Sequence, residues 1–112
     1  HPSGRYLTYA DGTPFFWLGD THWEFAFGER WDESNHPQMT SMFRGMADRR
    51  KEQGYNVYQT NLRSDSWKEH KSRYWKTDAA DDVPDVAFYQ NELDRRMQYL
   101  ADLGFILSLI HI

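Results

Sequence analysis

The distribution of apolar residues along the chain predicts short strands that alternate with helices. Four bulky apolar residues, 15–18, stand between the turn residues Asp11 and Gly12 on one side and Gly19 on the other. A short run of this kind is typical of a strand buried on both faces of a parallel sheet. Residues 4–9 alternate enough for a strand, and the intervening turn predicts a hairpin. We therefore expect residues 4–9 to flank the main sheet and residues 15–18 to enter it.

The first of two helical patterns follows a long connection. Asn35 is its predicted N-cap, with Pro37 in the first turn, and Gly54 is the predicted stop. Basic residues 49–51 fill the last turn, where cations complement the helix dipole. The positions that recur at helical spacing are Met39, Met42, Phe43, Met46, Ala47 and Arg50.

The second helical pattern begins at Asp85, the predicted cap, and ends at Gly104. Each helix leads through a single glycine into a short β-rich run, residues 55–62 and residues 105–110. The order is a hairpin strand followed by β, α, β, α and β, which predicts a parallel sheet with right-handed crossovers.

The connections of this α/β chain differ in length at the two ends of the predicted sheet. Both helix-to-strand joints are short and both strand-to-helix loops are long, so one end is plain and the other carries the loops. This asymmetry is found in a (β/α)8 TIM barrel, whose functional site is built from the βα loops. A doubly wound sheet is the alternative.

Composition excludes several classes of protein. The formal net charge of −4 argues against binding to a nucleic-acid backbone, and the absence of cysteine excludes thiolate metal sites. No apolar run approaches the ~20 residues that span a bilayer. Aromatic residues make up 17% of the chain, which is typical of a large core, an interface or stacking platforms for flat ligands. We expect no cofactor, no nucleic-acid partner and no membrane association.

Polar residues cluster after the first predicted strand, where parallel folds place their chemistry. Asp20, His22 and Trp23 are the candidates here: the carboxylate for hydrogen bonds to a ligand, the indole for stacking. The alternative for Asp20 is capping the loop or pairing with an arginine, and for Trp23 burial. His22 and Glu24 lack the third ligand that a metal site needs.

Further candidates follow the second strand. Residues 57, 59 and 61 share one face of the pleat, so Gln59 and Asn61 are expected to point together into the end of the barrel. Arg63 follows them, and Trp67 and Trp75 stand in a polar stretch that has no core pattern. We interpret these two indoles as a stacking platform, with a cover for the barrel end as the alternative.

Four strings of the sequence resemble one family, the apiosidase-like (β/α)8-barrel glycoside hydrolases. They are Gly4-Arg-Tyr-Leu, Asp11-Gly-Thr-Pro-Phe-Phe-Trp-Leu-Gly-Asp-Thr-His-Trp23, Asp48-Arg-Arg-Lys-Glu-Gln-Gly-Tyr-Asn-Val-Tyr-Gln59 and Arg95-Arg-Met-Gln-Tyr-Leu-Ala-Asp-Leu-Gly104. The resemblance implies an exported, typically bacterial enzyme that acts on plant cell-wall polysaccharide, in the periplasm or outside the cell. It also implies catalytic carboxylates on the fourth and seventh strands of a barrel more than twice this length. We therefore expect this chain to contribute substrate-binding residues and to lack the catalytic carboxylates.

The last residues depart from the family pattern. Residues 107–112 can be back-translated as CTG TCT CTT ATA CAC ATC, which matches a transposon end used in sequencing libraries. We therefore expect residues 1–106 to be the amino-terminal part of a catalytic barrel and residues 107–112 to be translated adapter. Reading the underlying nucleotides tests this hypothesis. The alternative functions are a small carbohydrate-binding module without catalysis and a doubly wound ligand-binding domain.

Overall fold

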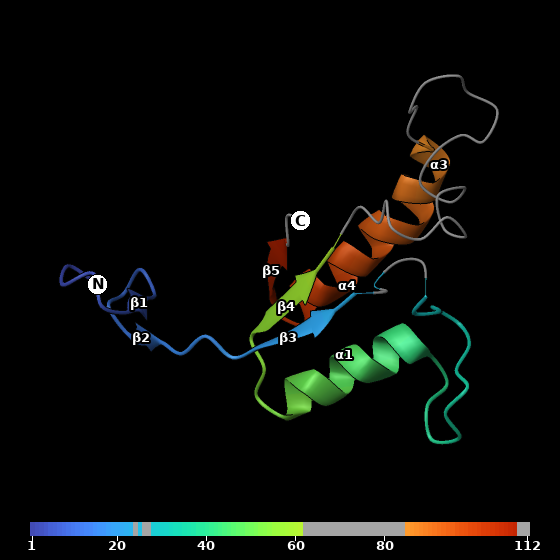
Figure 1. Cartoon of the computed structure of the whole chain (residues 1–112), viewed down its shortest axis with the longest axis horizontal. Helices are drawn as coiled ribbons and strands as arrows, with labels where there is room; N and C mark the ends of the chain where they lie inside the picture. The colour runs from blue at the N-terminus through green and yellow to red at the C-terminus, as the bar shows by residue number, and fades with distance from the viewer. Residues whose placement is uncertain (24, 26–27, 62–84, 110–112) are drawn as a thin grey trace.

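Three parallel strands form the centre of the molecule, in the order β3-β4-β5 (Figure 1). The structure is a computed structural model that describes residues 1–23, 25, 28–61 and 85–109. The strands are β3 (Gly19–His22), β4 (Val57–Thr60) and β5 (Ile106–Leu109), and helix α1 (Met42–Glu52) connects the first two. The predicted parallel β-α-β units are confirmed. That residues 107–112 are foreign to the protein stays a prediction.

One continuous helical segment precedes β5. It consists of α3 (Val86–Phe88), the π-helical turn η1 (Tyr89–Asp94) and α4 (Arg95–Asp102). As predicted, Asp85 caps its start, accepting a hydrogen bond from the Phe88 amide at 3.1 Å. Gly104 follows its end with a φ of +75°, a conformation that glycine adopts without strain.

The amino-terminal hairpin is separate from the main sheet. Strands β1 (Leu7–Thr8) and β2 (Pro14–Phe15) pair antiparallel, away from the three parallel strands in Figure 1. The prediction that residues 15–18 form the first strand of the sheet is therefore wrong. Residues 16–18 instead connect the hairpin to β3, and the Phe16 side chain is 75% exposed.

The first strand of the sheet lies four residues later than predicted. The Asn56 side chain fixes residues 16–18, the segment before this strand. Its oxygen accepts from the Leu18 amide at 2.9 Å and its nitrogen donates to the Phe16 carbonyl at 2.6 Å. Gly19 then pairs with Val57, and a Cβ on Gly19 would lie only 3.3 Å from both the Val57 Cβ and the Trp17 indole nitrogen. Any larger residue at position 19 would require the Val57 or Trp17 side chain to move by a few tenths of an ångström.

Helix α1 begins at Met42, seven residues after the predicted cap. The Ser41 hydroxyl accepts from the Arg44 amide at 3.1 Å, which satisfies one of the open donors at the helix start. Asn35 and Pro37 belong to the preceding loop. The helix ends as predicted, with Gly54 at a φ of +86°.

A single core lies between one face of the sheet and both helices. Its fully buried side chains include Phe43 and Ala47 from α1, Leu100 from α4 and Tyr58 from β4. The Tyr99 hydroxyl of α4 also donates to Asp48 of α1 at 2.6 Å, so the two helices are neighbours. Helices on one face fit a barrel wall and contradict the doubly wound alternative, which requires helices on both faces.

Candidate functional site

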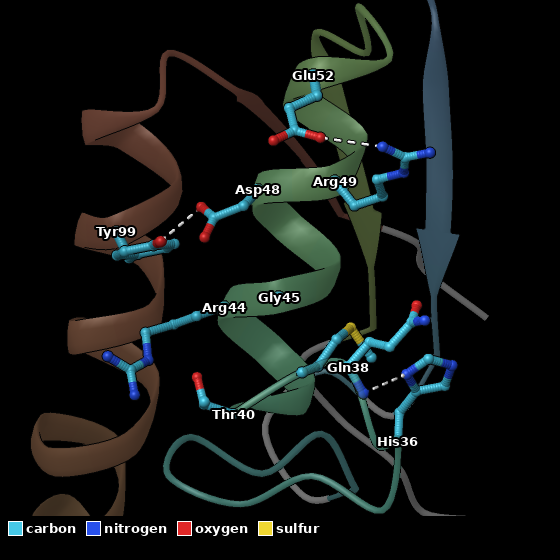
Figure 2. Close-up of a pocket in the computed structure, with 10 residues that line it drawn as sticks. His36, Gln38, Thr40, Arg44, Gly45, Asp48, Arg49, Glu52 and Tyr99 are labelled. Carbon is cyan, nitrogen blue, oxygen red and sulfur yellow. Dashed lines mark hydrogen bonds and ion pairs between the residues drawn. The ribbon is translucent and has the colours of Figure 1, made fainter.

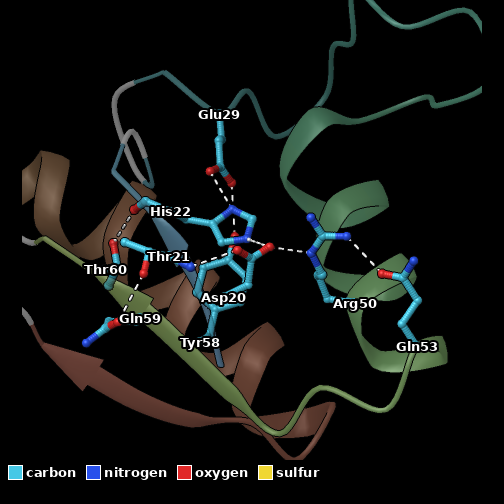
Figure 3. A network of polar contacts seen from close by, with 9 residues as sticks. All are labelled: Asp20, Thr21, His22, Glu29, Arg50, Gln53, Tyr58, Gln59 and Thr60. Atoms are coloured by element: carbon cyan, nitrogen blue, oxygen red, sulfur yellow. Dashed lines mark hydrogen bonds and ion pairs between the residues drawn. The ribbon is translucent and has the colours of Figure 1, made fainter. Parts of the chain in front are cut away.

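Successive side chains of β3 point to opposite faces of the sheet. Asp20 contacts Arg50 of α1, so Asp20 faces the helices, while Thr21 bonds Gln59 on the open face (Figure 3). His22 returns to the helix side and is 4% exposed. The helix side therefore carries the buried His22 and the ion-paired Asp20, and the open side carries Thr21 and Gln59, which are partly buried.

Asp20 is paired with Arg50, whose Nε donates to Asp20 Oδ2. Burial alone would raise the pKa of Asp20, but the hydrogen bond and charge of Arg50 together with the nearby His22 hold it below its ordinary value. The same pairing raises the pKa of Arg50. Asp20 is therefore an ionised group that ties β3 to α1.

His22 lies between two carboxylates. Its Nδ1 is 2.8 Å from Glu29 Oε1, and its Nε2 is 3.4 Å from Asp20 Oδ2. The ring stacks on Tyr58 with centroids 4.1 Å apart, and the Tyr58 hydroxyl donates to Glu29 Oε2 at 3.0 Å. Burial raises the pKa of Tyr58 far above the ordinary range of a phenol, so this hydroxyl stays protonated.

Replacing Asp20 by asparagine should make the free energy of unfolding less dependent on pH in acid. Because the folded pKa of Asp20 lies below its ordinary value of 3.8, its ionised form adds stability above that pH and loses it as the pH falls through the folded value. We expect a loss of about 0.5–1 kcal/mol near neutral pH, as for partly exposed ion pairs, and a smaller one in acid. Urea unfolding at several pH values measures this, with D32N at an exposed aspartate as the control.

The open face carries a short polar row. The Thr21 hydroxyl donates to Gln59 Oε1 at 3.0 Å, and Ser108 follows Gln59 in the strand register. Figure 3 shows the Gln59 amide nitrogen directed away from Thr21. Asn61 comes just after β4, and Trp23, just after β3, is 51% exposed. Hydroxyl and amide groups beside an exposed indole can hydrogen-bond and stack with a polyhydroxylated ring.

The predicted site residues thus fall into three groups. Gln59 lies on the open face, with Asn61 just past its strand and Trp23 at the same carboxyl end of the sheet. Asp20 and His22 lie inside β3 and face the helices, so their predicted contact with a ligand stays a prediction. Outside the described residues are Arg63, Trp67 and Trp75.

Several residues of this region were not predicted. The position of Thr21 follows from strand alternation once β3 is placed at Gly19–His22. Glu29 carries no such signal, because it stands in a loop between Gly28 and Arg30 without any recognisable motif. Arg50 was assigned to the buried stripe of the first helix by its spacing alone, and its partner Asp20 is 30 residues away.

A separate groove of about 720 Å³ lies on the helical side (Figure 2). Polar side chains that line the groove are hydrogen-bonded to one another. Arg49 donates to Glu52 at 3.1 Å, and Tyr99 donates to Asp48 at 2.6 Å. Burial and the Asp48 carboxylate raise the pKa of Tyr99 to about 12. Since barrel sites form at the carboxyl ends of strands, this groove is not the candidate site.

The fold defines a partial (β/α)8 barrel, and the candidate polar positions lie toward the carboxyl ends of β3 and β4. A crystal structure of a glycoside hydrolase family 5 from Bacteroides vulgatus ATCC 8482 matches it with a TM-score of 0.60 at 21% identity. The match covers 98% of this chain and 23% of that chain, so the present chain spans about a quarter of that protein. At this identity the match shows the fold alone.

The family is shown by a second comparison. The profile described as "Apiosidase-like, catalytic domain" matches residues 1–112, so the chain belongs to the apiosidase-like catalytic-domain family. The resemblance stated from the sequence strings is confirmed. No match was found among curated proteins. Within the described part of the chain, no helix is long and apolar enough to cross a bilayer.

Proposed function

We propose that this chain is part of a glycoside hydrolase that cleaves glycosidic bonds in plant cell-wall polysaccharide, and that it supplies substrate-binding residues. The observation that carries the proposal is the partly buried polar pair of Thr21 and Gln59 on the open face of the sheet, with the half-exposed Trp23 two residues further along the chain. Membership of the apiosidase-like family supports a carbohydrate as the ligand. The predicted role of Asn61 in the same row belongs to this proposal.

The chain itself is expected to be inactive. Hydrolysis of a glycosidic bond needs two carboxyl groups that face each other across the substrate, roughly 5–10 Å apart. Among the described residues, Asp20 and Glu29 are turned to the helix side, where Arg50 binds the first and Tyr58 and His22 bind the second. The family resemblance supports a catalytic pair on later strands, and it also supports export to the periplasm or the medium.

The test is binding without turnover. The purified 112-residue chain is titrated with xylan- and pectin-derived oligosaccharides by calorimetry, and the products are analysed by chromatography. We expect weak binding and no released sugar. Released sugar would contradict the proposed absence of the catalytic pair, and a lack of binding to every oligosaccharide would contradict the proposed binding site.

Replacing Gln59 by alanine should weaken binding without unfolding the chain. One net hydrogen bond is worth about 0.5–1.5 kcal/mol, so the dissociation constant should rise about two- to tenfold. The matched control is Q98A, which removes an exposed glutamine on α4 that bonds only Asp102 in the described contacts. Equal affinities of the two variants would remove Gln59 from the site.

A further inference from the structure

Glu29 is a buried carboxylate whose partners come from three other parts of the fold. Its side chain meets His22 of β3 at 2.8 Å and accepts from Tyr58 of β4 at 3.0 Å. Its backbone carbonyl accepts from the Arg96 guanidinium of α4, also at 3.0 Å. Glu29 is 8% exposed. Because a buried carboxylate is costly unless its oxygens are hydrogen-bonded, these contacts define one position for it.

The contact with Glu29 fixes the last residue of β3. A carboxylate can only accept, so Nδ1 of His22 carries the hydrogen in this contact. The imidazole is also stacked on Tyr58, and the His22 carbonyl accepts from the Thr60 hydroxyl at 3.0 Å. Side chain and main chain of His22 are thus both held (Figure 3).

The residue directly after this fixed point is Trp23, whose side chain is half exposed at the carboxyl end of the sheet. An indole can stack on a sugar only if the chain leaves the strand in a defined direction. The residue before Trp23 is His22, which is held by Glu29, Tyr58 and Thr60. A buried ionic cluster is weak evidence for added stability, since apolar replacements of such clusters are often neutral or stabilising. We therefore interpret the cluster around Glu29 as one that orients the chain at residues 22 and 23.

We propose that Glu29 is a positioning residue for carbohydrate binding: it acts through His22 to place Trp23 at the rim of the site. This inference rests on the proposed function. Glu29 does not contact the sugar in this scheme, because it lies on the helix side of the sheet and is buried. Its effect on affinity is carried entirely by the backbone of residues 22 and 23.

The experiment compares E29Q with E33Q in the 112-residue chain. Glutamine keeps the shape of Glu29 but has one acceptor oxygen in place of two, so it cannot serve both His22 and Tyr58 as the carboxylate does. Glu33 is the control, because its side chain is 71% exposed and pairs only loosely with Arg30, at 3.5 Å. Three quantities are measured: the ¹⁵N resonances of the His22 ring, the ¹⁹F resonance of fluorotryptophan at position 23, and the affinity for xylan- and pectin-derived oligosaccharides. The fluorine resonance is assigned with W23F.

For E29Q we expect a changed His22 ring spectrum, a shifted or broadened Trp23 resonance and about two- to tenfold weaker binding, as for the loss of one aromatic stacking contact. E33Q should match the wild type in all three. If E29Q folds and leaves both the Trp23 resonance and the affinity unchanged, the proposal is overturned. If E29Q does not fold, Y58F removes one hydrogen bond from Glu29 and should give the same changes to a smaller degree.

The outcome for the proposed function is separate. If the wild type binds none of the oligosaccharides, the proposed carbohydrate site is wrong, while the Trp23 resonance of E29Q still decides whether Glu29 positions this side chain. If the wild type binds and E29Q binds equally well with an unchanged resonance, the site stands and Glu29 has no part in it.

Discussion

Replacing Phe43 by alanine is expected to lower the free energy of unfolding by about 3–5 kcal/mol, the cost of removing a buried phenylalanine from a core. Phe43 is fully buried at the middle of an aromatic cluster. Its ring stacks on Trp31 with centroids 5.6 Å apart and meets Phe25, Tyr58 and Tyr99 edge-on. The loss is a large fraction of the stability of typical domains, about 5–15 kcal/mol.

The control for this prediction is another phenylalanine. Phe16 is 75% exposed on the connection between the hairpin and β3, so F16A should change stability by no more than about 0.5 kcal/mol. Urea unfolding followed by circular dichroism measures both variants. A loss of less than about 1 kcal/mol in F43A, well under the core range, would show that α1 does not pack on the sheet as described.

Elements that depend on local chemistry were predictable from the sequence. Asp85 caps its helix, and Gly54 and Gly104 end theirs with positive φ values, because caps and stops act within one turn of the chain. The alternation of strands and helices follows from the same signals. The start of α1 was missed, since Asn35 and Ser41 are both good caps. Ser41 is 1% exposed beside the Arg30 carbonyl, so tertiary packing favours the second cap.

The first strand was misplaced because its residues look polar in isolation. Gly19–His22 has no apolar side chain, yet it lies at the edge of the sheet with its helix side filled by partners from elsewhere. Arg50 pairs with Asp20 and Glu29 pairs with Nδ1 of His22, while the buried His22 Nε2 has no hydrogen-bond partner among the described residues and lies 3.4 Å from Asp20 Oδ2. No pattern within the strand shows partners that lie 30 and 7 residues away.

The four-residue difference between the predicted and observed first strand determines which site residues were predicted correctly. Gln59 was placed on the open face because strand alternation holds for β4, whose predicted position was nearly correct. Asp20 and His22 were expected beyond the end of a strand and instead lie within one, where the alternation turns both toward α1. Thr21 takes the open face in their place and meets Gln59.

Replacing Arg96 by methionine is expected to cost about 1–3 kcal/mol, the penalty for leaving a buried hydrogen-bonding group without its partner, because Glu92 is partly exposed and keeps Arg95. Arg96 is 2% exposed and donates to the Glu92 carboxylate at 2.6 Å, the Glu92 carbonyl at 2.8 Å and the Glu29 carbonyl at 3.0 Å. Its guanidinium also lies over the ring of Phe43, 5.4 Å from the centroid. Methionine fills the volume but leaves both carbonyls without this donor.

The neighbouring arginine provides a control with the same ion-pair partner. Arg95 donates to the same Glu92 oxygen at 2.7 Å and lies over Trp31, but its side chain is 35% exposed. Water can replace its contacts, so R95M should cost only about 0.2–1 kcal/mol.

The pH dependence of the two variants follows from Glu92, the partner that both arginines share. Burial alone would raise the pKa of Glu92, but Arg96 and Arg95 together hold it below its ordinary value. The ion pairs of both arginines with Glu92 therefore add stability above that value and lose it in acid. The carbonyl contacts of Arg96 do not titrate, so R96M should stay less stable than R95M as the pH falls. Urea midpoints of R96M and R95M measure the difference. Equal losses at neutral pH would mean that Arg96 does not join the first βα loop to α4.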